Sequence, residues 1–485
     1  MALLFPRPFA FAVDDLGWNE GSDLSITPHG GPHRAGVKRN FDLQDYQAMV
    51  AVGKAAGVRI QCLFILSEMD RANVLAKYPT TTHQREKWNN THRVNSHQLA
   101  IMEYVKAQAA FIEFGLHGTG HEYWAAGLPQ RRAEWYNLID KHPWPEDELQ
   151  GHILAFKEIL AQYGLSPAEG HSFPQSFVPC AYSYYWNPTG AYSLGKLLAE
   201  AGVKYANTDF SQIPELNPPP EVNGGDFDFG VHVINRINYG NPWYQLDSLP
   251  TTPLPEQQTD VIESHWPNWL AQDDFLQEAV TAKWVAYYNQ VQQLTDRYVA
   301  KNTRQLHSQW LYKKFTHLQE LSAGRVEIDN RAMPDQSYQR DLLGNLVVKL
   351  RIQPGQFVHA FLNGNAIPAY FYQQPWCFLY LNTLQAEVYQ LTYSIESTPP
   401  AVFVQHDGTG NIYKLESKPG CIMVDVEVYG SQVVKIYCPR PVSVTAAGPL
   451  ILKKFNYASH NSLLEVEIAA PDIQGSRGLV QIATE

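Results

Sequence analysis

The 485-residue chain lacks several features that would assign it to common protein classes. It has only five cysteines, none in a C-x-x-C pair: Cys62, Cys180, Cys377, Cys421 and Cys438. Scattered thiols in odd number are typical of a reducing compartment and argue against a zinc site built from cysteines. No apolar stretch approaches the ~20 residues of a membrane-spanning helix, and the first residues do not read as a signal peptide. We therefore expect a cytoplasmic protein with no membrane partner.

Basic residues are also scarce. Lys and Arg number 37 against 48 Asp and Glu, which gives a formal net charge of −11. Without a basic stripe to offset this charge, the sequence argues against a nucleic-acid partner. No glycine-rich loop of the phosphate-cradling type is found. Hydrophobic residues make up 45% of the chain and charged residues 18%, a composition typical of a folded globular protein.

The composition and the hydrophobic pattern of the chain change near residue 325. Of the 12 tryptophans 11 lie before this point, and of the 17 histidines 14 do. In this first part, short apolar runs alternate with helical patterns. We expect strands at about 8–13, 58–66, 111–116, 203–208, 231–236 and 259–264, and helices at about 41–56, 96–110, 146–163, 191–201, 275–299 and 303–321. This alternation predicts βαβ units around a parallel sheet, either open or closed into a barrel.

After residue 325 the helical pattern disappears. Short β-branched runs that mostly alternate apolar with polar residues recur at 346–352, 424–428, 433–437 and 463–468, separated by turn signals. Such runs are typical of antiparallel β-sandwiches. The sequence therefore predicts two parts, an α/β domain at 1–325 and a β-sandwich region at 326–485.

Candidate metal ligands follow two of the expected strands. Asp14 and Asp15 end the first apolar run, and His117 and His121 follow the strand at 111–116. Carboxyl ends of parallel strands are where α/β folds carry their chemistry. One carboxylate with two imidazoles suits a catalytic divalent metal with an open position, and the second carboxylate is left to act as a base. If the chain turns helical after the strand, the two histidines share one face. The plainer alternative for the aspartates is a solvated turn.

A third strand, Val261-Ile262-Glu263-Ser264, ends in His265. The order of these motifs resembles the polysaccharide deacetylase family, also called the NodB-homology or carbohydrate esterase family four group. That family has an apolar run ending in Asp-Asp, then His-(Ser/Thr)-x-x-His, and finally a strand ending in His. The resemblance covers roughly residues 8–270 and implies a distorted (β/α) barrel for the first part of the chain.

The resemblance also implies roles for single residues. Asp14 would be the general base, Asp15, His117 and His121 would hold the metal, most plausibly Zn²⁺, and His265 would protonate the leaving amine. The implied activity is that of a metal-dependent hydrolase that deacetylates an N- or O-acetylated saccharide. Aromatic rings near the motifs could stack on sugar rings, so we expect Trp18, Trp124 and Trp266 to bind the substrate together with Arg34 and His171.

The chain departs from the family pattern at two points. Gly118 stands where the family has Ser or Thr, and Thr119 could substitute for it. The stretch 170–174, which contains His171, lacks the arginine that holds the family's catalytic base, and Arg34 could supply that charge. Two further hypotheses therefore stay open: a catalytically inactive carbohydrate-binding or scaffold protein that keeps the fold, and a hydrolase of a non-sugar amide.

Overall fold

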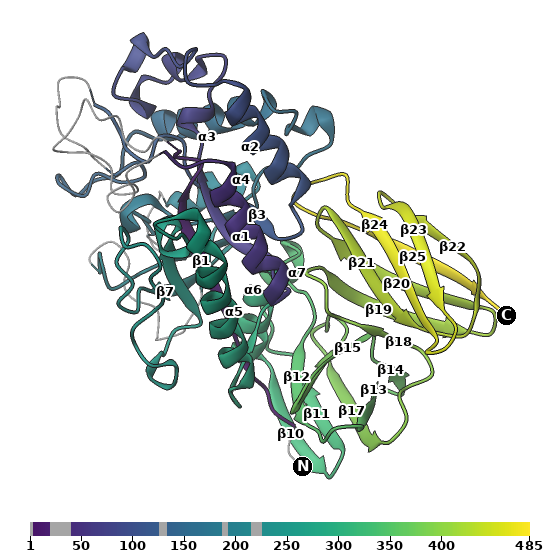
Figure 1. Cartoon of the computed structure of the whole chain (residues 1–485). Coiled ribbons are helices and arrows are strands. Elements are labelled where there is room, and N and C mark those ends of the chain that lie inside the picture. The colour runs from purple at the N-terminus through teal and green to yellow at the C-terminus, as the bar shows by residue number, and fades with distance from the viewer. Residues whose placement is uncertain (1–2, 20–39, 126–132, 187–192, 215–225) are drawn as a thin grey trace. The chain divides into compact units, whose positions relative to one another are not determined.

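The computed structural model describes residues 3–19, 40–125, 133–186, 193–214 and 226–485 (Figure 1). Its contacts divide the chain into two compact units. The barrel unit comprises Ala10–Ala56 and Ile60–Tyr287, and the β-rich unit comprises Met1–Phe9, Gly57–Arg59 and Tyr288–Glu485.

The barrel unit contains a closed barrel of seven parallel strands. They are β1 (Arg7–Leu16), β2 (Ile60–Ile65), β3 (Ile112–Gly118), β4 (Ser176–Phe177), β5 (Tyr205–Thr208), β7 (Val231–Ile237) and β8 (Val261–His265). The ring closes because β1 pairs in parallel with both β2 and β8. The short β6 (Asp226–Asp228) pairs antiparallel with β7. All residues of β2 and β3 are buried, as expected for strands covered on both faces.

Helices follow five of the barrel strands: the first four connect β1 to β5 in turn, and the fifth follows β8. They are α1 (Leu43–Ala56), α2 (Ser96–Ala107), α3 (Glu146–Ala161), α4 (Leu194–Ala201) and α5 (Gln277–Gln293). Local chemistry fixes their ends: Asn95 and Gln98 form a capping box at the start of α2, and three acidic residues occupy the first turn of α3. Single turns of 3-10 helix lie at Ser67–Met69, Val74–Lys77, Pro79–Thr81, Arg85–Lys87, Pro167–Glu169, Cys180–Tyr182, Leu254–Glu256, Trp266–Trp269 and Asp274–Leu276.

The β-rich unit holds three further sheets, as far as the described residues show. In sheet order, the first is β10 (His317–Ser322), β11 (Arg325–Asp329), β17 (Val388–Glu396), β13 (Phe357–Leu362) and β14 (Asn365–Ala366). The second is β12 (Val347–Arg351), β16 (Trp376–Tyr380), β15 (Ala369–Gln373), β18 (Phe403–Gln405), β21 (Ser431–Tyr437), β24 (Leu463–Ala469) and β23 (Ile451–Ala458). The third is β19 (Asn411–Lys418), β20 (Cys421–Val428), β25 (Ser476–Thr484) and β22 (Pro441–Ala447).

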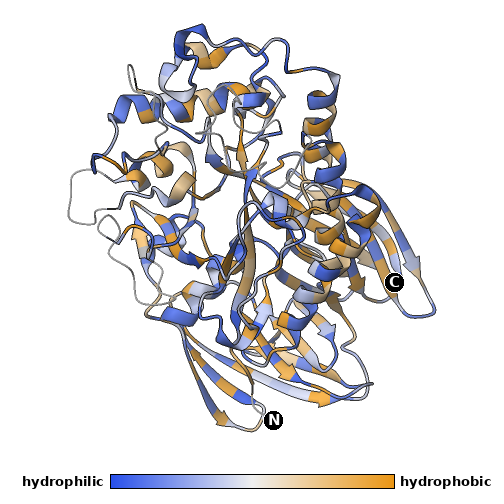
Figure 2. Ribbon diagram, turned by 60° about the vertical axis from the view of Figure 1, so that its left-hand side comes forward, coloured by the Kyte–Doolittle hydropathy of each residue, from blue (hydrophilic) through white to orange (hydrophobic). Residues whose placement is uncertain are grey.

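Alternating apolar residues form the core between these sheets. In β20 the side chains of Ile422, Val424 and Val426 are buried, and in β24 those of Leu464 and Ile468 are. Figure 2 shows the alternation of apolar and polar residues along the strands. Strands with one buried face are typical of sheets that pack against each other. The expected barrel followed by a β-rich region is thus confirmed.

Two expected helices end earlier than the sequence predicts. Residues 297–299 of the expected helix at 275–299 form β9 (Arg297–Val299), which pairs with the first residues of β1. Residues 317–321 of the expected helix at 303–321 belong to β10, which forms a hairpin with β11. In both places strand pairing outweighs local helix propensity, which is a weak determinant.

The boundary between the two units lies at Tyr287–Tyr288, earlier in the chain than the change of sequence pattern near residue 325. The helix α6 (Thr303–Phe315) belongs to the β-rich unit, and its residues 303–312 are all buried. Its Gln309 donates a hydrogen bond to the carbonyl of Val347 (2.7 Å) and accepts one from the Val347 amide (2.8 Å). The short α7 (Asp335–Gln339) lies in the same unit. In the part of the chain that the structure describes, no helix is long and apolar enough to cross a membrane.

This division predicts the behaviour of a shortened chain. Ending the protein after residue 325 removes most of the sheets that bury α6, so its apolar side chains would be exposed and the fragment is expected to aggregate. Soluble yield and size-exclusion chromatography of this fragment, beside the full chain, test the expectation. A soluble monomer that unfolds cooperatively would instead place the boundary near residue 325.

Candidate metal and catalytic site

The two aspartates of β1 lie in a bulge at the carboxyl end of the strand. The pairing of β1 with β2 shifts register between Val13 and Leu16, and Asp15 has a φ of +72°. Both side chains are almost fully buried, Asp14 at 2% and Asp15 at 1% exposure. A bulge changes the direction of successive side chains. As a result Asp15 faces two histidines, whereas Asp14 faces an arginine.

His117 and His121 converge on Asp15. Their Nε2 atoms lie 3.4 and 3.7 Å from Asp15 Oδ1. Each ring is fixed through its other nitrogen: His117 Nδ1 lies 2.8 Å from the carbonyl oxygen of Val178, and His121 Nδ1 lies 3.0 Å from Glu122 Oε1. An acceptor at Nδ1 leaves the lone pair on Nε2, which is the arrangement of metal-ligating histidines.

The chain does not turn helical after β3, so the condition for a shared helical face is not met. His121 has a φ of +66°, in the left-handed region, and the residues around it form bends. The backbone passes close to its neighbour here, since a Cβ atom on Gly120 would lie 2.0 Å from the carbonyl oxygen of Thr81. A tight non-helical turn, and not helical spacing, therefore brings the two imidazoles together.

Glu134 fixes this turn through buried hydrogen bonds. Its Oε1 accepts hydrogen bonds from the Thr119 amide (2.8 Å) and pairs with His152 Nδ1 (2.7 Å), and all three residues are fully buried. Thr119 donates its hydroxyl to the His152 carbonyl (2.7 Å). The other Glu134 oxygen would lie 2.2 Å from a Cβ atom on Gly118. Gly118 departs from the family pattern because a glutamate fills the space of its side chain.

The donor set fits a divalent cation. Asp15 Oδ1 is buried and accepts no hydrogen bond from any described residue. Burial raises the pKa of Asp15, but the neighbouring imidazoles, His117 first, outweigh burial and hold the pKa well below its usual value. An ionised carboxylate buried in this way needs positive charge beside it, which a divalent cation would supply. One carboxylate oxygen and two imidazole nitrogens are the ligands of a catalytic zinc site with an open position.

Cys180 also lies at this site, where the sequence analysis gave it no role. Its Sγ and ring nitrogens of His117 and His121 lie within 4.8 Å of one another. The thiol contacts the carbonyl oxygen of His117 at 3.3 Å. Burial raises the pKa of Cys180, so a neutral thiol, not a thiolate, borders the two imidazoles. Its position after the short β4 gave no signal in the sequence.

Asp14 forms a buried ion pair with Arg236 of β7. The guanidinium donates two hydrogen bonds, to Oδ1 (2.9 Å) and Oδ2 (2.7 Å). Burial raises the pKa of Asp14, but the charge and hydrogen bonds of Arg236, together with His117 and His265, lower the pKa below its usual value, so the carboxyl is ionised. Arg236 also lies 3.7 Å from Glu263. The sequence analysis missed Arg236, and Arg34, which it offered for this charge, lies outside the described residues.

His265 ends β8 in register with Asp14 of the adjacent β1. It thus lies beside Asp14 in the sheet. Its backbone amide donates to Asn268 Oδ1 (2.8 Å), which fixes the chain as it leaves the strand. Its Nδ1 is buried and has no partner among the residues the structure describes.

The aromatic residues expected at the substrate differ in their placement. Trp18 packs on a metal-site ring, with its centroid 4.9 Å from that of His121, and is 4% exposed. Trp124 is 8% exposed. Trp266 is fully buried between Phe41 and Tyr46, with centroid distances of 4.4 and 4.7 Å. The expected stacking role is therefore wrong for Trp266, which leaves no ring face for a ligand.

His171 is also wrongly expected at the substrate. It lies between α3 and β4, in a connection that enters a barrel strand at its amino end. The candidate metal ligands lie at the carboxyl ends, on the opposite face of a parallel barrel.

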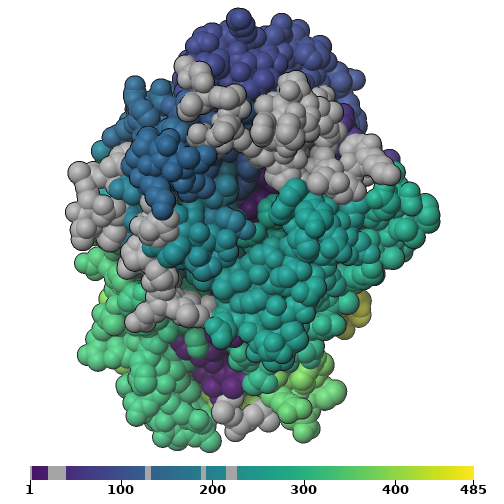
Figure 3. Space-filling model, turned by 90° about the vertical axis from the view of Figure 1, so that its left-hand side faces the viewer, coloured from purple at the N-terminus to yellow at the C-terminus, as the bar shows by residue number. Residues whose placement is uncertain are grey.

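Figure 3 looks onto a hollow in the barrel unit, where part of the purple N-terminal segment is visible between blue and teal segments.

Comparisons with known proteins leave the family open. No family model matches the sequence, and no curated protein matches it. Among solved structures, the GH57-type branching enzyme of the hyperthermophilic archaeon Pyrococcus horikoshii is similar at a TM-score of 0.26 and 11% identity, over 47% of this chain and 47% of that chain. The match spans less than half of either protein, and a similarity this low supports no conclusion about fold or function.

The geometry predicts which substitutions remove a metal. Asp15→Ala and His117→Ala should lose bound zinc after dialysis, because each removes one of three ligands, as measured by elemental analysis. Asp14→Asn is the matched control: it changes an equally buried neighbouring carboxylate that faces Arg236, and it should retain the metal. Full metal occupancy in both ligand variants would contradict the assignment. If Asp14→Asn lost the metal and Asp15→Asn kept it, Asp14 would be the ligand and Asp15 the base.

Proposed function

We propose that the protein is a metal-dependent hydrolase with a deacetylase-type barrel, which removes acetyl groups from an N- or O-acetylated saccharide. The observation that carries the proposal is the bulge in β1, which directs Asp15 to two oriented imidazoles and Asp14 to Arg236. A metal ligand and a base on adjacent residues are what hydrolysis by an activated water requires.

The cation would be held by Asp15, His117 and His121, and when bound it would supply Lewis acidity for the water and for the oxyanion. Asp14 accepts the proton of the attacking water. Arg236 keeps Asp14 ionised and fixes both of its oxygens, so the base has a single orientation. Arg236 is thus a positioning residue.

His265 donates a proton to the leaving group. An amine departs poorly unless it is protonated, so an acid beside the base is required. The register of β1 and β8 supports this role, because it brings His265 next to Asp14. Trp18, which packs on His121, borders the same site.

The Asp14–Arg236 pair favours an enzyme over the inactive binding protein. That alternative rests on the missing motif arginine, and Arg236 offers an equivalent charge from another strand. The preference for a saccharide over another amide rests on the family resemblance.

Acetate release tests the proposal. Purified zinc-loaded protein should release acetate from N-acetylglucosamine oligomers or from acetylated xylo-oligosaccharides. Asp14→Asn should lower kcat/KM by about 10²–10⁴-fold, as expected for loss of a general base. No acetate from any acetylated saccharide or small acetyl ester would contradict the proposal.

Arg236→Lys is the companion variant to Asp14→Asn. Because Arg236 lowers the pKa of Asp14, a less complementary lysine should let that pKa rise. The acidic limb of the kcat/KM profile should then move to higher pH, with metal content unchanged. An unshifted limb would remove Asp14 from the role of base.

The role of His265 predicts a dependence on the leaving group. His265→Ala should slow hydrolysis of an amide far more than that of an acetyl ester with a good leaving group, which scarcely needs protonation. His171→Ala, on the opposite face of the barrel, serves as the histidine control and should leave both rates unchanged. Equal losses on the two substrates would show that His265 only binds or packs.

A further inference from the structure

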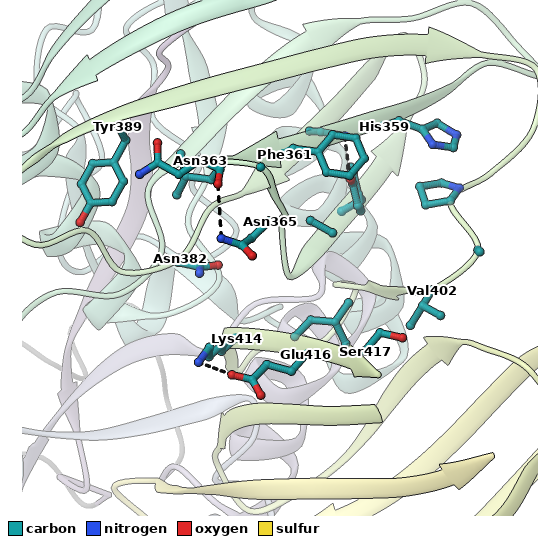
Figure 4. Close-up of a pocket in the computed structure, with 18 of the residues that line it drawn as sticks. His359, Phe361, Asn363, Asn365, Asn382, Tyr389, Val402, Lys414, Glu416 and Ser417 are labelled. Atoms are coloured by element: carbon teal, nitrogen blue, oxygen red, sulfur yellow. Dashed lines mark hydrogen bonds and ion pairs between the residues drawn. The ribbon is translucent and has the colours of Figure 1, made fainter. Parts of the chain in front are cut away.

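The β-rich unit contains a polar groove formed by two adjoining cavities of about 860 and 420 Å³. Asn382, Thr383 and Lys414 line both cavities. The larger cavity lies between the β13–β14 hairpin on one side and β19 on the other (Figure 4). These volumes are in the range of ligand-binding pockets. The proposed hydrolase site uses none of the groove residues.

Unpaired polar groups line this groove. Asn382 Oδ1 and Thr383 Oγ1 are buried at its wall, and neither has a hydrogen-bond partner within the described chain. Ser337 Oγ, which borders the smaller cavity, is in the same state. Buried polar groups are normally paired, and leaving one unpaired costs free energy. Asn382 and Thr383 are partly exposed, so their side chains are available to a ligand that carries hydrogen-bond donors, whereas Ser337 is fully buried.

The charged side chains of the groove lie beside opposite charges, with Glu416 shared by two lysines. Lys414 pairs with Glu416, and Arg477 donates two hydrogen bonds to Asp425 (2.9 and 2.7 Å). Asp341 pairs with Arg304 at 2.9 Å, and Lys418 lies 3.9 Å from Glu416. A groove for phosphate or another anion would hold cations without such partners. The paired charges favour a neutral ligand.

Aromatic rings border the same space. Phe361 is 41% exposed, an unusual state for a phenylalanine in a cavity wall, and Tyr389 is half-buried. Figure 4 shows both rings on the hairpin side, with Lys414 and Glu416 opposite and Asn382 between. Apolar ring faces next to amide and hydroxyl groups match the two surfaces of a sugar, its C–H face and its hydroxyl edge.

We propose that this polar groove is a non-catalytic binding site for a neutral oligosaccharide. Phe361 and Tyr389 offer ring faces for stacking, while Asn382 and Thr383 form hydrogen bonds with its hydroxyl groups. The proposal rests on the groove alone and does not depend on the hydrolase reaction.

Isothermal calorimetry on the full chain tests the groove. The probes are neutral tetra- to hexasaccharides of N-acetylglucosamine, glucose and xylose, with a sulfated tetrasaccharide as the anionic comparison. At least one neutral probe should bind more tightly than the sulfated one. Asn382→Ala and Phe361→Ala should each raise the Kd by about tenfold, in line with loss of a hydrogen bond or a stacked ring. Phe361→Trp keeps an aromatic face, so its Kd should stay close to that of the unaltered protein, in contrast to Phe361→Ala.

Two controls separate the groove from the rest of the molecule. Phe455→Ala removes a phenylalanine of similar exposure (46%) on β23 outside the groove, and its Kd should match the unaltered protein. His117→Ala should lose the proposed hydrolysis but keep groove binding, so the two proposals fail separately. The groove proposal is overturned if no neutral probe binds, if the sulfated probe binds more tightly, or if Asn382→Ala and Phe361→Ala bind as the unaltered chain does.

Discussion

The burial of two adjacent carboxylates at the end of β1 is the constraint on which the site depends. Each must have its negative charge compensated, because an isolated ion in a barrel interior is costly. Asp14 is compensated by the bidentate guanidinium of Arg236. Asp15 faces imidazoles that carry no obligatory charge. The bulge separates the two side chains. Asp14 is therefore paired with an arginine, and Asp15 is placed where a bound cation would compensate its charge.

The residues behind the ligands follow from the same constraint. Ligand atoms must be held in place before a cation arrives, so Val178 and Glu122 fix the imidazole rings and Glu134 fixes the turn between them. Asp15 and His121 adopt left-handed backbone conformations, which cost non-glycine residues free energy. Conformations of this kind persist where the surroundings impose them, and here the buried contacts of Glu134 and the passage of Gly120 against Thr81 do so.

The sequence predicted the parts of this site that depend on strand ends. The apolar runs before Asp14, His117 and His265 located β1, β3 and β8, and parallel pairing then brings their ends together. Arg236 was missed because it lies inside an expected strand, where no local pattern distinguishes a buried ion pair from a surface charge. Cys180 and Glu134 come from irregular connections, whose path is set by tertiary contacts. The expected helix at 275–299 ends early for a related reason, since β9 pairs with β1, far away in the sequence. The expected helix at 303–321 ends early because residues 317–322 form a hairpin with 325–329.

The two candidate binding sites differ in which of their charged and polar groups are paired, and they therefore suit different ligands. In the polar groove the charged side chains lie close to opposite charges, and the buried groups left unpaired are an amide oxygen and hydroxyls. In the barrel, Arg236 pairs with Asp14, while Asp15 Oδ1 faces the Nε2 atoms of His117 and His121. An excess of negative donor atoms favours a divalent cation, whereas unpaired neutral donors and acceptors favour a hydroxyl-rich ligand. Because these preferences follow from different residues in different units, one site can be removed by substitution without altering the chemistry of the other.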